Sequence, residues 1–261
     1  MGKFSGILLC SDFDSTLAYN AEIPQANVDA IRYFQKNGGL FTVISGRSAE
    51  FFDGYSDQIA PDRYLGSVNG NMIFDVEKRE IVEDHLMSRS DILLDFILSN
   101  YKTWDNLKDV RIFGEIGRGE FAVLISDGDF EKKVIEAMSA PVYKVLFHGR
   151  RAFEESEIEW MHRSVGESFG IWRSWSSGAE IQDINYDKGT AARRIAELLG
   201  AKTLICAGDY ENDVPLLRVA DIAYAAKVHH PSLDPLAHRI GRSCDEGTIA
   251  GIIEDLDKEI K

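Results

Sequence analysis

Near its start the chain reads Ile7-Leu8-Leu9-Cys10-Ser11-Asp12-Phe13-Asp14-Ser15-Thr16-Leu17, an apolar run that ends in two aspartates. The apolar run predicts a buried β-strand, and carboxylates two positions apart then lie on one side of the pleat. In α/β proteins the end of such a strand is the edge of the sheet where ligands bind. One carboxylate can attack a substrate there while the other moves protons. The alternative is a solvated turn or a helix N-cap, which a lone Asp-x-Asp commonly forms.

A second apolar strand, Leu40-Phe41-Thr42-Val43-Ile44, runs into Ser45-Gly46-Arg47. The Ser45 hydroxyl can donate a hydrogen bond to an anion at the strand end. Gly46 lets the backbone come close to a ligand, and the turn that follows offers free N–H groups. An ordinary strand followed by a Ser-Gly turn explains the same residues without a ligand.

Two later segments bring positive and negative charge. Lys188 lies near the start of a helix predicted from Asp187-Lys188-Gly189-Thr190 onward, where a cation is misplaced unless an anion is close. The apolar strand at residues 203–207 runs into Gly208-Asp209-Tyr210-Glu211-Asn212-Asp213, whose oxygen ligands suit a hard cation. The alternatives are an exposed surface lysine and an acidic turn that caps the next helix.

Taken in order, these four segments resemble the motifs of the haloacid dehalogenase superfamily, and in particular its Cof-like phosphatases. Further matches are Val68-Asn69-Gly70-Asn71 and Asp245-Glu246-Gly247-Thr248-Ile249-Ala250. The resemblance implies an α/β fold, with a Rossmann-like core built on a parallel sheet and an inserted α+β cap domain of type two (IIB). About 140 residues separate the second and third motifs, too many for one connection in a compact domain. We therefore expect the core at residues 1–86 and 186–261 and the cap at residues 87–185.

The resemblance also implies a role for each motif residue. Asp12 is the expected nucleophile, because an ionised carboxylate needs no base to activate it. Asp14 is the expected general acid and then general base. Magnesium is the expected cofactor. Its expected site consists of the carboxylates of Asp12 and Asp209 and the backbone carbonyl of Asp14, with Asp213 orienting the ligands or waters around the ion. The phosphoryl oxygens are expected to bind the side chains of Ser45, Lys188 and Asn212.

Four residues are candidates for contact with the substrate. Arg47 and Asn69 follow strand ends, where an ion pair and a turn amide explain them equally well. In the expected cap, Arg118 and Arg150 lie in the loops Gly117-Arg118-Gly119 and His148-Gly149-Arg150-Arg151 and could contact the leaving group. Hairpin turns with solvated charges are the alternative for both loops.

The chain departs from the family pattern at two places. Ser15 stands where the family usually has glycine, so the turn after Asp14 must accommodate a side chain. The Gly-Asn-Ala that many Cof-like members carry after the fourth motif is replaced by Ala223-Tyr224-Ala225-Ala226-Lys227-Val228. No role of that asparagine can therefore be transferred to this chain.

The composition bears on partners and location. The chain has 261 residues, with 29 Lys and Arg against 43 Asp and Glu, and a net charge of −14. That sign is wrong for a nucleic-acid surface. Three widely spaced cysteines, Cys10, Cys206 and Cys244, favour a reduced, cytoplasmic setting. No signal peptide and no apolar run of membrane-spanning length is visible, so we expect no membrane partner. The sequence is silent on oligomeric state.

Local patterns predict the elements around the motifs. A helix begins at Pro24 with Val28, Ile31 and Phe34 on one face, and a hairpin covers residues 72–82. In the expected cap, helices lie near residues 91–101, 130–138 and 154–169, and strands near 110–113, 121–125, 142–147, 171–176 and 180–184. A strand would turn Trp172 and Trp175 to opposite faces, so we expect at least one of them in the cap core.

The expected function is that of a magnesium-dependent phosphatase, which hydrolyses a small phosphorylated metabolite such as a sugar phosphate through an aspartyl-phosphate. A phosphomutase of related fold uses the same pair of aspartates but returns the phosphoryl group to the sugar. A binding or regulatory protein on the same fold is the non-enzymatic alternative. Against it stands the joint presence of Asp12, Asp14, Lys188 and Asp209.

Overall fold

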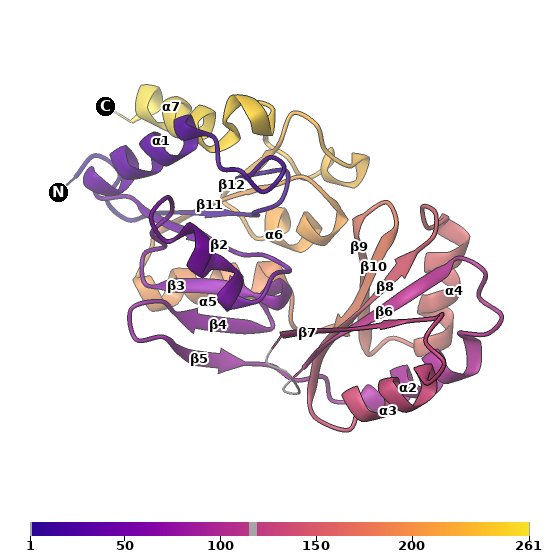
Figure 1. Cartoon of the computed structure of the whole chain (residues 1–261). Helices are drawn as coiled ribbons and strands as arrows, with labels where there is room; N and C mark the ends of the chain where they lie inside the picture. The colour runs from indigo at the N-terminus through magenta and orange to yellow at the C-terminus, as the bar shows by residue number, and fades with distance from the viewer. Residues whose placement is uncertain (1, 115–118, 261) are drawn as a thin grey trace. The chain divides into compact units, whose positions relative to one another are not determined.

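The computed structural model of the protein describes residues 2–114 and 119–260. The chain forms two compact units (Figure 1). The first, here called the core unit, comprises Met1–Asp84 and Asp187–Lys261, and the second, the inserted unit, comprises His85–Tyr186. Throughout residues 2–114 and 119–260, each helix is too short or too polar to cross a bilayer.

A parallel β-sheet organises the core unit, and its strands are apolar because both faces are covered. The strand order is β13-β12-β11-β1-β2. The strands are β1 Ile7–Ser11, β2 Leu40–Val43, β11 Thr203–Gly208, β12 Ile222–Ala225 and β13 Arg239–Ile240. Ser11 of β1 is in register with Ala207 of β11 and with Val43 of β2. The carboxyl ends of these three strands therefore meet at one edge of the sheet.

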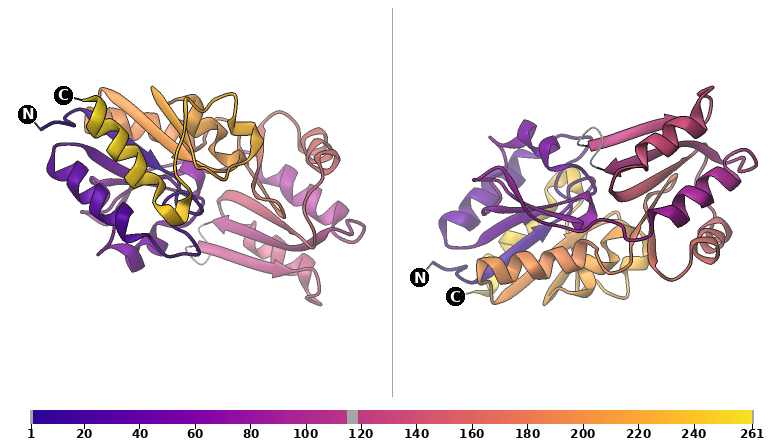
Figure 2. Two further views of the ribbon diagram at one scale, coloured as in Figure 1. Left: turned by 90° about the horizontal axis from the view of Figure 1, so that it is seen from above. Right: turned by 90° about the horizontal axis from the view of Figure 1, so that it is seen from below.

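Helices cover both faces of this sheet. α1 (Gln25–Lys36) and α7 (Thr248–Glu259) pack on one face and lie side by side (Figure 2). α5 (Lys188–Leu199) and α6 (Val214–Arg218) pack on the other face. The prediction for α1 is confirmed, because Val28, Ile31 and Phe34 are its buried apolar residues. The helix ends before Gly38, whose φ of 88° suits glycine.

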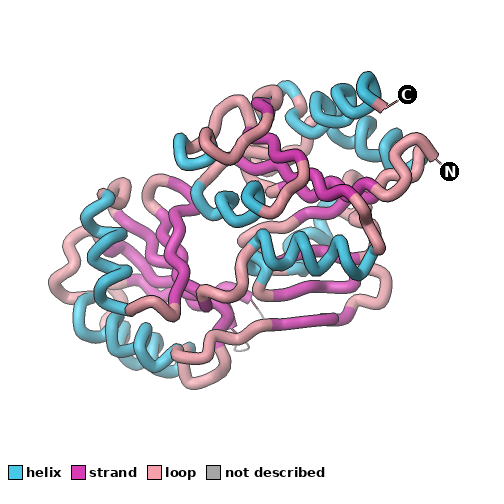
Figure 3. The backbone as a smooth tube through the Cα atoms, turned by 180° about the vertical axis from the view of Figure 1, so that it is seen from behind, coloured by secondary structure: helices cyan, strands magenta, loops and turns pink. Residues whose placement is uncertain are grey.

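A smaller antiparallel sheet completes the core unit. It pairs β3 (Tyr64–Ser67), β4 (Met72–Asp75) and β5 (Glu80–Asp84) in that order, which confirms the predicted hairpin. α5 packs against β3, β4 and the 3-10 turn η2, Val68–Gly70 (Figure 3). Further 3-10 turns of this unit are η1 Ala49–Tyr55, η3 Glu211–Asp213, η4 Pro231–Leu233 and η5 Cys244–Glu246.

The inserted unit is an antiparallel sheet with helices packed against it. The strand order is β7-β6-β8-β10-β9. The elements are α2 Ser90–Asn100, β6 Leu107–Gly114, β7 Gly119–Leu124, α3 Phe130–Ala137, β8 Val142–Gly149, α4 Glu155–Val165, β9 Phe169–Trp175 and β10 Gly178–Asp183. Leu93, Val110, Phe147 and Met161 belong to a core that the helices and the sheet share. A parallel α/β core with an α+β insertion is the fold that the sequence predicts.

The predicted extent of α4 is wrong. The helix ends at Val165 rather than near Phe169. Gly166 adopts a φ of 85°, which ends the helix, and Phe169 then begins β9. Apolar spacing alone did not distinguish the last helical turn from the first residue of the strand.

The expectation that Trp172 or Trp175 lies in the core of the inserted unit is also wrong. Trp172 is half-buried, and Trp175 is 37% exposed. Each indole covers a neighbouring glycine instead. A Cβ atom at Gly170 would lie 2.0 Å from the Trp172 ring, and one at Gly178 would lie 2.4 Å from the Trp175 ring. The two tryptophans therefore stabilise the β9–β10 hairpin locally.

Candidate active site

The predicted carboxylates gather where β1 and β11 end. Asp12 follows β1 directly, and its backbone N–H donates to the Ala207 carbonyl at 2.9 Å, which extends the pairing of the two strands. Asp209 follows β11 directly, and Asp213 ends η3. One carboxylate oxygen from each of Asp12, Asp209 and Asp213 lies within 4.8 Å of the others. The register of two parallel strands thus assembles residues that are about 200 positions apart in the sequence.

Lys188 joins two of these carboxylates. Its Nζ donates to Oδ1 of Asp12 and to Oδ1 of Asp213, both at 2.6 Å. The lysine side chain is 1% exposed. It starts α5, whose first turn is capped by Asp187, since the Thr190 N–H donates to the Asp187 carboxylate at 2.7 Å. The cation that a helix N-terminus disfavours is thus balanced by two anions.

Backbone amides fix Asp213 as well. Its Oδ2 accepts the N–H of Asp209 at 2.9 Å and the N–H of Tyr210 at 3.2 Å. Gly208 permits this close approach, because a Cβ atom there would lie 2.5 Å from the Asp213 Cβ. The glycine before Asp209 is therefore required by the packing of Asp213 against the strand end.

Burial and like charge dominate the electrostatics of the cluster. Burial raises the pKa of Asp12 well above its usual range, with Lys188 opposing the rise and Asp213 and Asp209 adding to it. Burial and the Asp213 charge raise the pKa of Asp209 to about 7. Burial acts to lower the pKa of Lys188, but attraction to Asp12 and Asp213 outweighs it and raises that pKa. With all three carboxylates ionised, the site would carry more negative charge than Lys188 balances, and this repulsion is part of what raises the two aspartate pKa values.

The chemistry of the donor set fits a hard divalent cation. Carboxylate oxygens are the ligands that Mg²⁺, Ca²⁺ and Mn²⁺ prefer, and three of them converge here. Asp12, Asp209 and Asp213 could therefore hold a metal ion. The Asp14 side chain is not part of this carboxylate group. The predicted role of the Asp14 backbone carbonyl as a metal ligand stays a prediction.

Asp14 forms an ion pair with Arg47. The Arg47 Nε donates to Asp14 Oδ2 and the Arg47 Nη2 to Asp14 Oδ1, both at 3.0 Å. The sequence left two alternatives for Arg47, a substrate contact or an ion pair. The structure shows the ion pair, and its partner is the residue expected to carry protons.

Ser45, Asn69 and Asn212 lie in the loops at this edge of the core unit. Ser45 is 1% exposed, and its Oγ accepts the Arg47 N–H at 3.2 Å, so the hydroxyl hydrogen can still turn to another acceptor. The Asn69 N–H donates to the Ser45 carbonyl at 2.8 Å. Asn212 is buried within η3. Contact of these side chains with phosphate or substrate stays a prediction.

The turn η2 is strained and joins two of the motifs. Val68, Asn69 and Gly70 have φ values of 51°, 56° and 88° in succession, and a positive φ is rare for a β-branched residue. The Val68 N–H donates to the Arg47 carbonyl at 2.9 Å. A Cβ atom at Gly70 would lie 2.3 Å from the Asp187 carbonyl oxygen. The turn therefore holds the loop after β2 close to the start of α5, and such strain is concentrated at functional sites.

Sequence reasoning gave no role to Thr16 or Cys244. The Thr16 Oγ1 donates to Asp209 Oδ1 at 3.0 Å, which orients a carboxylate of the cluster. The sequence could have pointed to Thr16, because this hydroxyl residue follows Asp14 by only two positions. Burial and the charges of Asp209 and Asp12 raise the pKa of Cys244 to about 12, so this thiol stays protonated beside the cluster.

Of the two predicted arginines of the inserted unit, Arg150 lies within the described residues and Arg118 does not. Arg118 lies outside the described residues, in the segment 115–118 that connects β6 to β7. Arg150 is exposed and directly follows β8. Contact of Arg118 or Arg150 with the leaving group stays a prediction.

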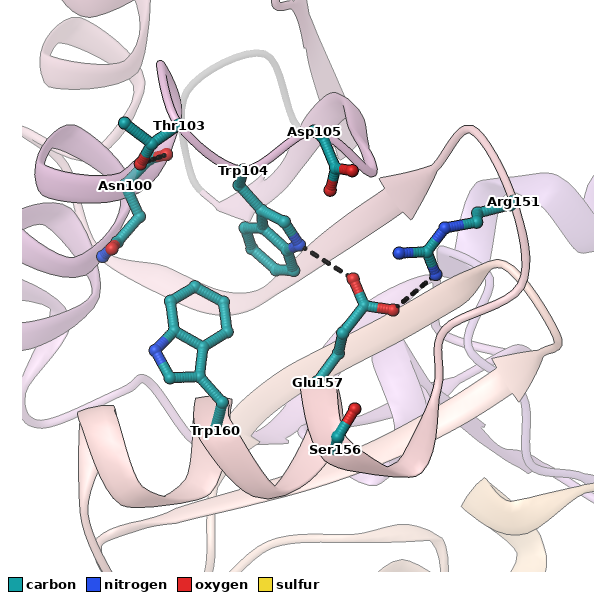
Figure 4. Close-up of a pocket in the computed structure, with 8 residues that line it drawn as sticks. All are labelled: Asn100, Thr103, Trp104, Asp105, Arg151, Ser156, Glu157 and Trp160. Carbon is teal, nitrogen blue, oxygen red and sulfur yellow. Dashed lines mark hydrogen bonds and ion pairs between the residues drawn. The ribbon is translucent and has the colours of Figure 1, made fainter.

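A hollow of about 320 Å³ in the inserted unit has a structural explanation. Figure 4 shows Trp104 and Arg151 pointing at Glu157, and the hydrogen bonds measure 3.1 Å and 2.8 Å. The Glu157 carboxylate also accepts the Glu154 N–H at 2.9 Å, which completes the N-terminal cap of α4. Hydrogen bonds of Glu157 therefore link the start of α4 to the turn after α2. We interpret the hollow as a result of this packing and not as a binding site.

Comparison with known proteins places the chain in a family. The model of the haloacid dehalogenase-like hydrolase family matches residues 9–253. The chain is 27% identical over 256 residues to phosphoglycolate phosphatase 2 of Saccharolobus solfataricus, an alignment that covers 97% of this chain and 91% of that protein.

Solved structures share the whole fold. A haloacid dehalogenase-like hydrolase from B. subtilis superposes with a TM-score of 0.75 at 18% identity, covering 95% of this chain and 98% of that one. A sugar phosphatase of haloacid dehalogenase subclass IIB superposes with a TM-score of 0.77 at 18% identity, covering 97% and 98%. The predicted resemblance, fold class and enzyme class are confirmed by these matches. The chain belongs to the haloacid dehalogenase-like hydrolase family.

Proposed function

We propose that this protein is a magnesium-dependent phosphatase that hydrolyses a small phosphorylated metabolite, such as a sugar phosphate, through an aspartyl-phosphate on Asp12. The observation that carries the proposal is the position of Lys188, which bridges Asp12 and Asp213 at 2.6 Å beside Asp209. A buried lysine that neutralises part of a carboxylate cluster suits a site that must admit a dianionic phosphate.

A phosphate that enters this site is repelled by the carboxylates. A phosphate group near these carboxylates meets repulsion of about 1 to 4 kcal/mol per close pair at effective dielectric constants of 80 to 20. Magnesium held by Asp12, Asp209 and Asp213 would supply the positive charge that offsets this repulsion. Lys188 adds a second positive charge that is already fixed in place, and Ser45 and Asn212 would donate hydrogen bonds to the phosphoryl oxygens.

The chain's own residues account for both proton transfers. In the first step an Asp12 oxygen bonds to phosphorus, the bond between phosphorus and the ester oxygen breaks, and Asp14 gives its proton to the departing oxygen. In the second step a water oxygen attacks the same phosphorus and gives its proton to Asp14. The bond to Asp12 breaks, inorganic phosphate leaves, and both aspartates return to their starting states.

The proposal is tested by phosphate release from p-nitrophenyl phosphate, with and without a chelator, followed by a panel of phosphorylated metabolites ranked by kcat/KM. Phosphoglycolate and sugar phosphates belong in that panel, because similar proteins bear those names. We expect release with Mg²⁺ and loss of activity by several orders of magnitude in Asp12→Asn. Equal release by wild-type protein and Asp12→Asn, or equal release in the chelator, would contradict the proposal.

A further inference from the structure

Arg47 donates a hydrogen bond to each oxygen of the Asp14 carboxylate. The two hydrogen bonds, Nε to Oδ2 and Nη2 to Oδ1, are both 3.0 Å long and form a bidentate pair, here called a fork. The two side chains are 47% and 48% exposed. An exposed ion pair usually contributes little to stability, but a bidentate guanidinium–carboxylate pair fixes orientation as well as distance.

Arg47 is itself held from several sides. Its guanidinium lies 4.7 Å from the centre of the Phe51 ring. That ring packs edge-on against Phe13, the residue between the two aspartates, with centroids 5.4 Å apart. The backbone of Arg47 is fixed by Ser45 on its N–H and by Val68 on its carbonyl. Contacts thus hold both the guanidinium and the backbone of Arg47.

The turn that follows Asp14 fixes its backbone. Asp14 precedes Ser15, which adopts a positive φ of 64° and whose N–H donates to the Ala18 carbonyl at 2.9 Å. This turn fixes the Asp14 backbone but leaves the side-chain torsions to be set by what the carboxylate contacts. A proton carrier must be aligned with the reacting oxygen, and a displacement of about 1 Å can cost a hundredfold in rate.

We propose that Arg47 is a positioning residue, which aligns the Asp14 carboxylate for both proton transfers and does not bind substrate. This rests on the proposed function, in which Asp14 carries the protons. The strained turn η2 holds the backbone of Arg47, and Phe51, which packs on Phe13, contacts its guanidinium. A positioning residue differs from a substrate contact in one measurable way, because the effect of removing it depends on the leaving group.

The experiment compares kcat/KM for p-nitrophenyl phosphate and phenyl phosphate, which differ in leaving group and little in shape. Phenolate is the poorer leaving group and needs the proton from Asp14 more. We expect Arg47→Ala and Asp14→Asn each to raise the ratio of kcat/KM for p-nitrophenyl phosphate over phenyl phosphate by about tenfold or more. Arg47→Lys keeps the charge but loses the fork, so it should raise the ratio to a similar extent.

Arg79→Ala is the matched control. Arg79 forms a comparable fork with Asp53, at 3.0 Å and 2.9 Å, in the same unit. Its removal should leave the ratio unchanged, and thermal unfolding of each variant reports any loss of folding. In the double variant Arg47→Ala with Asp14→Asn, we expect no further change beyond Asp14→Asn alone, since both substitutions disable one function.

Two outcomes would overturn the inference while leaving the phosphatase intact. An equal loss on both substrates in Arg47→Ala, or losses that multiply in the double variant, would make Arg47 a substrate contact. If Asp14→Asn itself shows no dependence on the leaving group, Asp14 is not the proton carrier, and both the inference and that part of the proposed function fail.

Discussion

At the scale of single residues, Lys188 supplies the positive charge that offsets the buried carboxylates. Its two hydrogen bonds of 2.6 Å compensate Asp12 and Asp213, while Asp209 relies on Thr16 and partial exposure. Burial and Asp213 raise the pKa of Asp209 to about 7, against an ordinary value of 3.8. Below about pH 7 a cation that binds this cluster must therefore displace a proton.

This gives a prediction about pH and metal. Between pH 4 and pH 7 the folded, metal-free protein keeps a proton on Asp209 that the unfolded chain has lost. The contribution of Asp209 to the free energy of unfolding should therefore fall as pH rises, by up to about 1.4 kcal/mol per pH unit, and the raised pKa of Asp12 acts in the same direction. Mg²⁺ binds the deprotonated form, so the rise in Tm that it causes should be larger at pH 8 than at pH 5.5. Thermal denaturation in Mg²⁺ and in a chelator measures both.

The matched control for this prediction is Asp209→Asn, which removes the titrating group and keeps its size. We expect it to reduce the pH dependence of Tm in the chelator, with the contribution of Asp12 remaining, and to reduce the effect of Mg²⁺. A Mg²⁺-induced rise in Tm that is the same at both pH values in the wild-type protein would contradict the reasoning.

At the scale of elements, the packing of α5 on α6 decides where Lys188 lies. A Cβ atom at Gly189 would lie 2.3 Å from the Pro215 carbonyl oxygen, an approach that only movement of the helices could relieve. Gly189→Ala should therefore lower the free energy of unfolding, measured with urea, by about 1–3 kcal/mol. It should also lower phosphatase activity, because it displaces Lys188. Gly54→Ala, with no atom within 4 Å of the added Cβ, should be close to neutral. Equal stability of the two variants would count against this account.

The sequence predicted elements best where apolar periodicity was strong. α1 is identified by Val28, Ile31 and Phe34 and by the glycines that end it. The β1, β2 and β11 ends carry the predicted residues because parallel strands in one sheet must end at the same edge. The pairing of Asp14 with Arg47 could not be predicted, because it depends on the path of two loops and on the Phe13–Phe51 contact between them.

The sequence was less informative in the inserted unit. The end of α4 depends on the positive φ of Gly166, and apolar spacing gave no signal of it. The tryptophans of the β9–β10 hairpin pack on glycines of the same hairpin, and burial cannot be inferred from residue type in that case. Substrate contacts of this unit stay predictions for the same reason, since they depend on the paths of loops.

At the scale of the whole molecule, the inserted unit has what a separate domain needs. Its apolar core is its own, and the His85 and Tyr186 rings at its two ends stack with centroids 3.7 Å apart. We expect a polypeptide of residues 85–186 to fold alone and to unfold cooperatively on heating. Mg²⁺ should not change its Tm, because the carboxylate cluster lies in the core unit. A gradual unfolding curve in circular dichroism, or a metal-dependent Tm, would contradict this expectation.

The central claim is that Asp12 forms the covalent bond to phosphorus. It is tested most directly by mass spectrometry of enzyme quenched within milliseconds of mixing with p-nitrophenyl phosphate and Mg²⁺. Asp14→Asn should accumulate a phosphate on the peptide that contains residue 12, because attack on a good leaving group continues while water lacks its base. Asp12→Asn should show no adduct and should lose turnover by several orders of magnitude. A phosphate adduct on the Asp12→Asn protein, or full turnover by that variant, would contradict the mechanism.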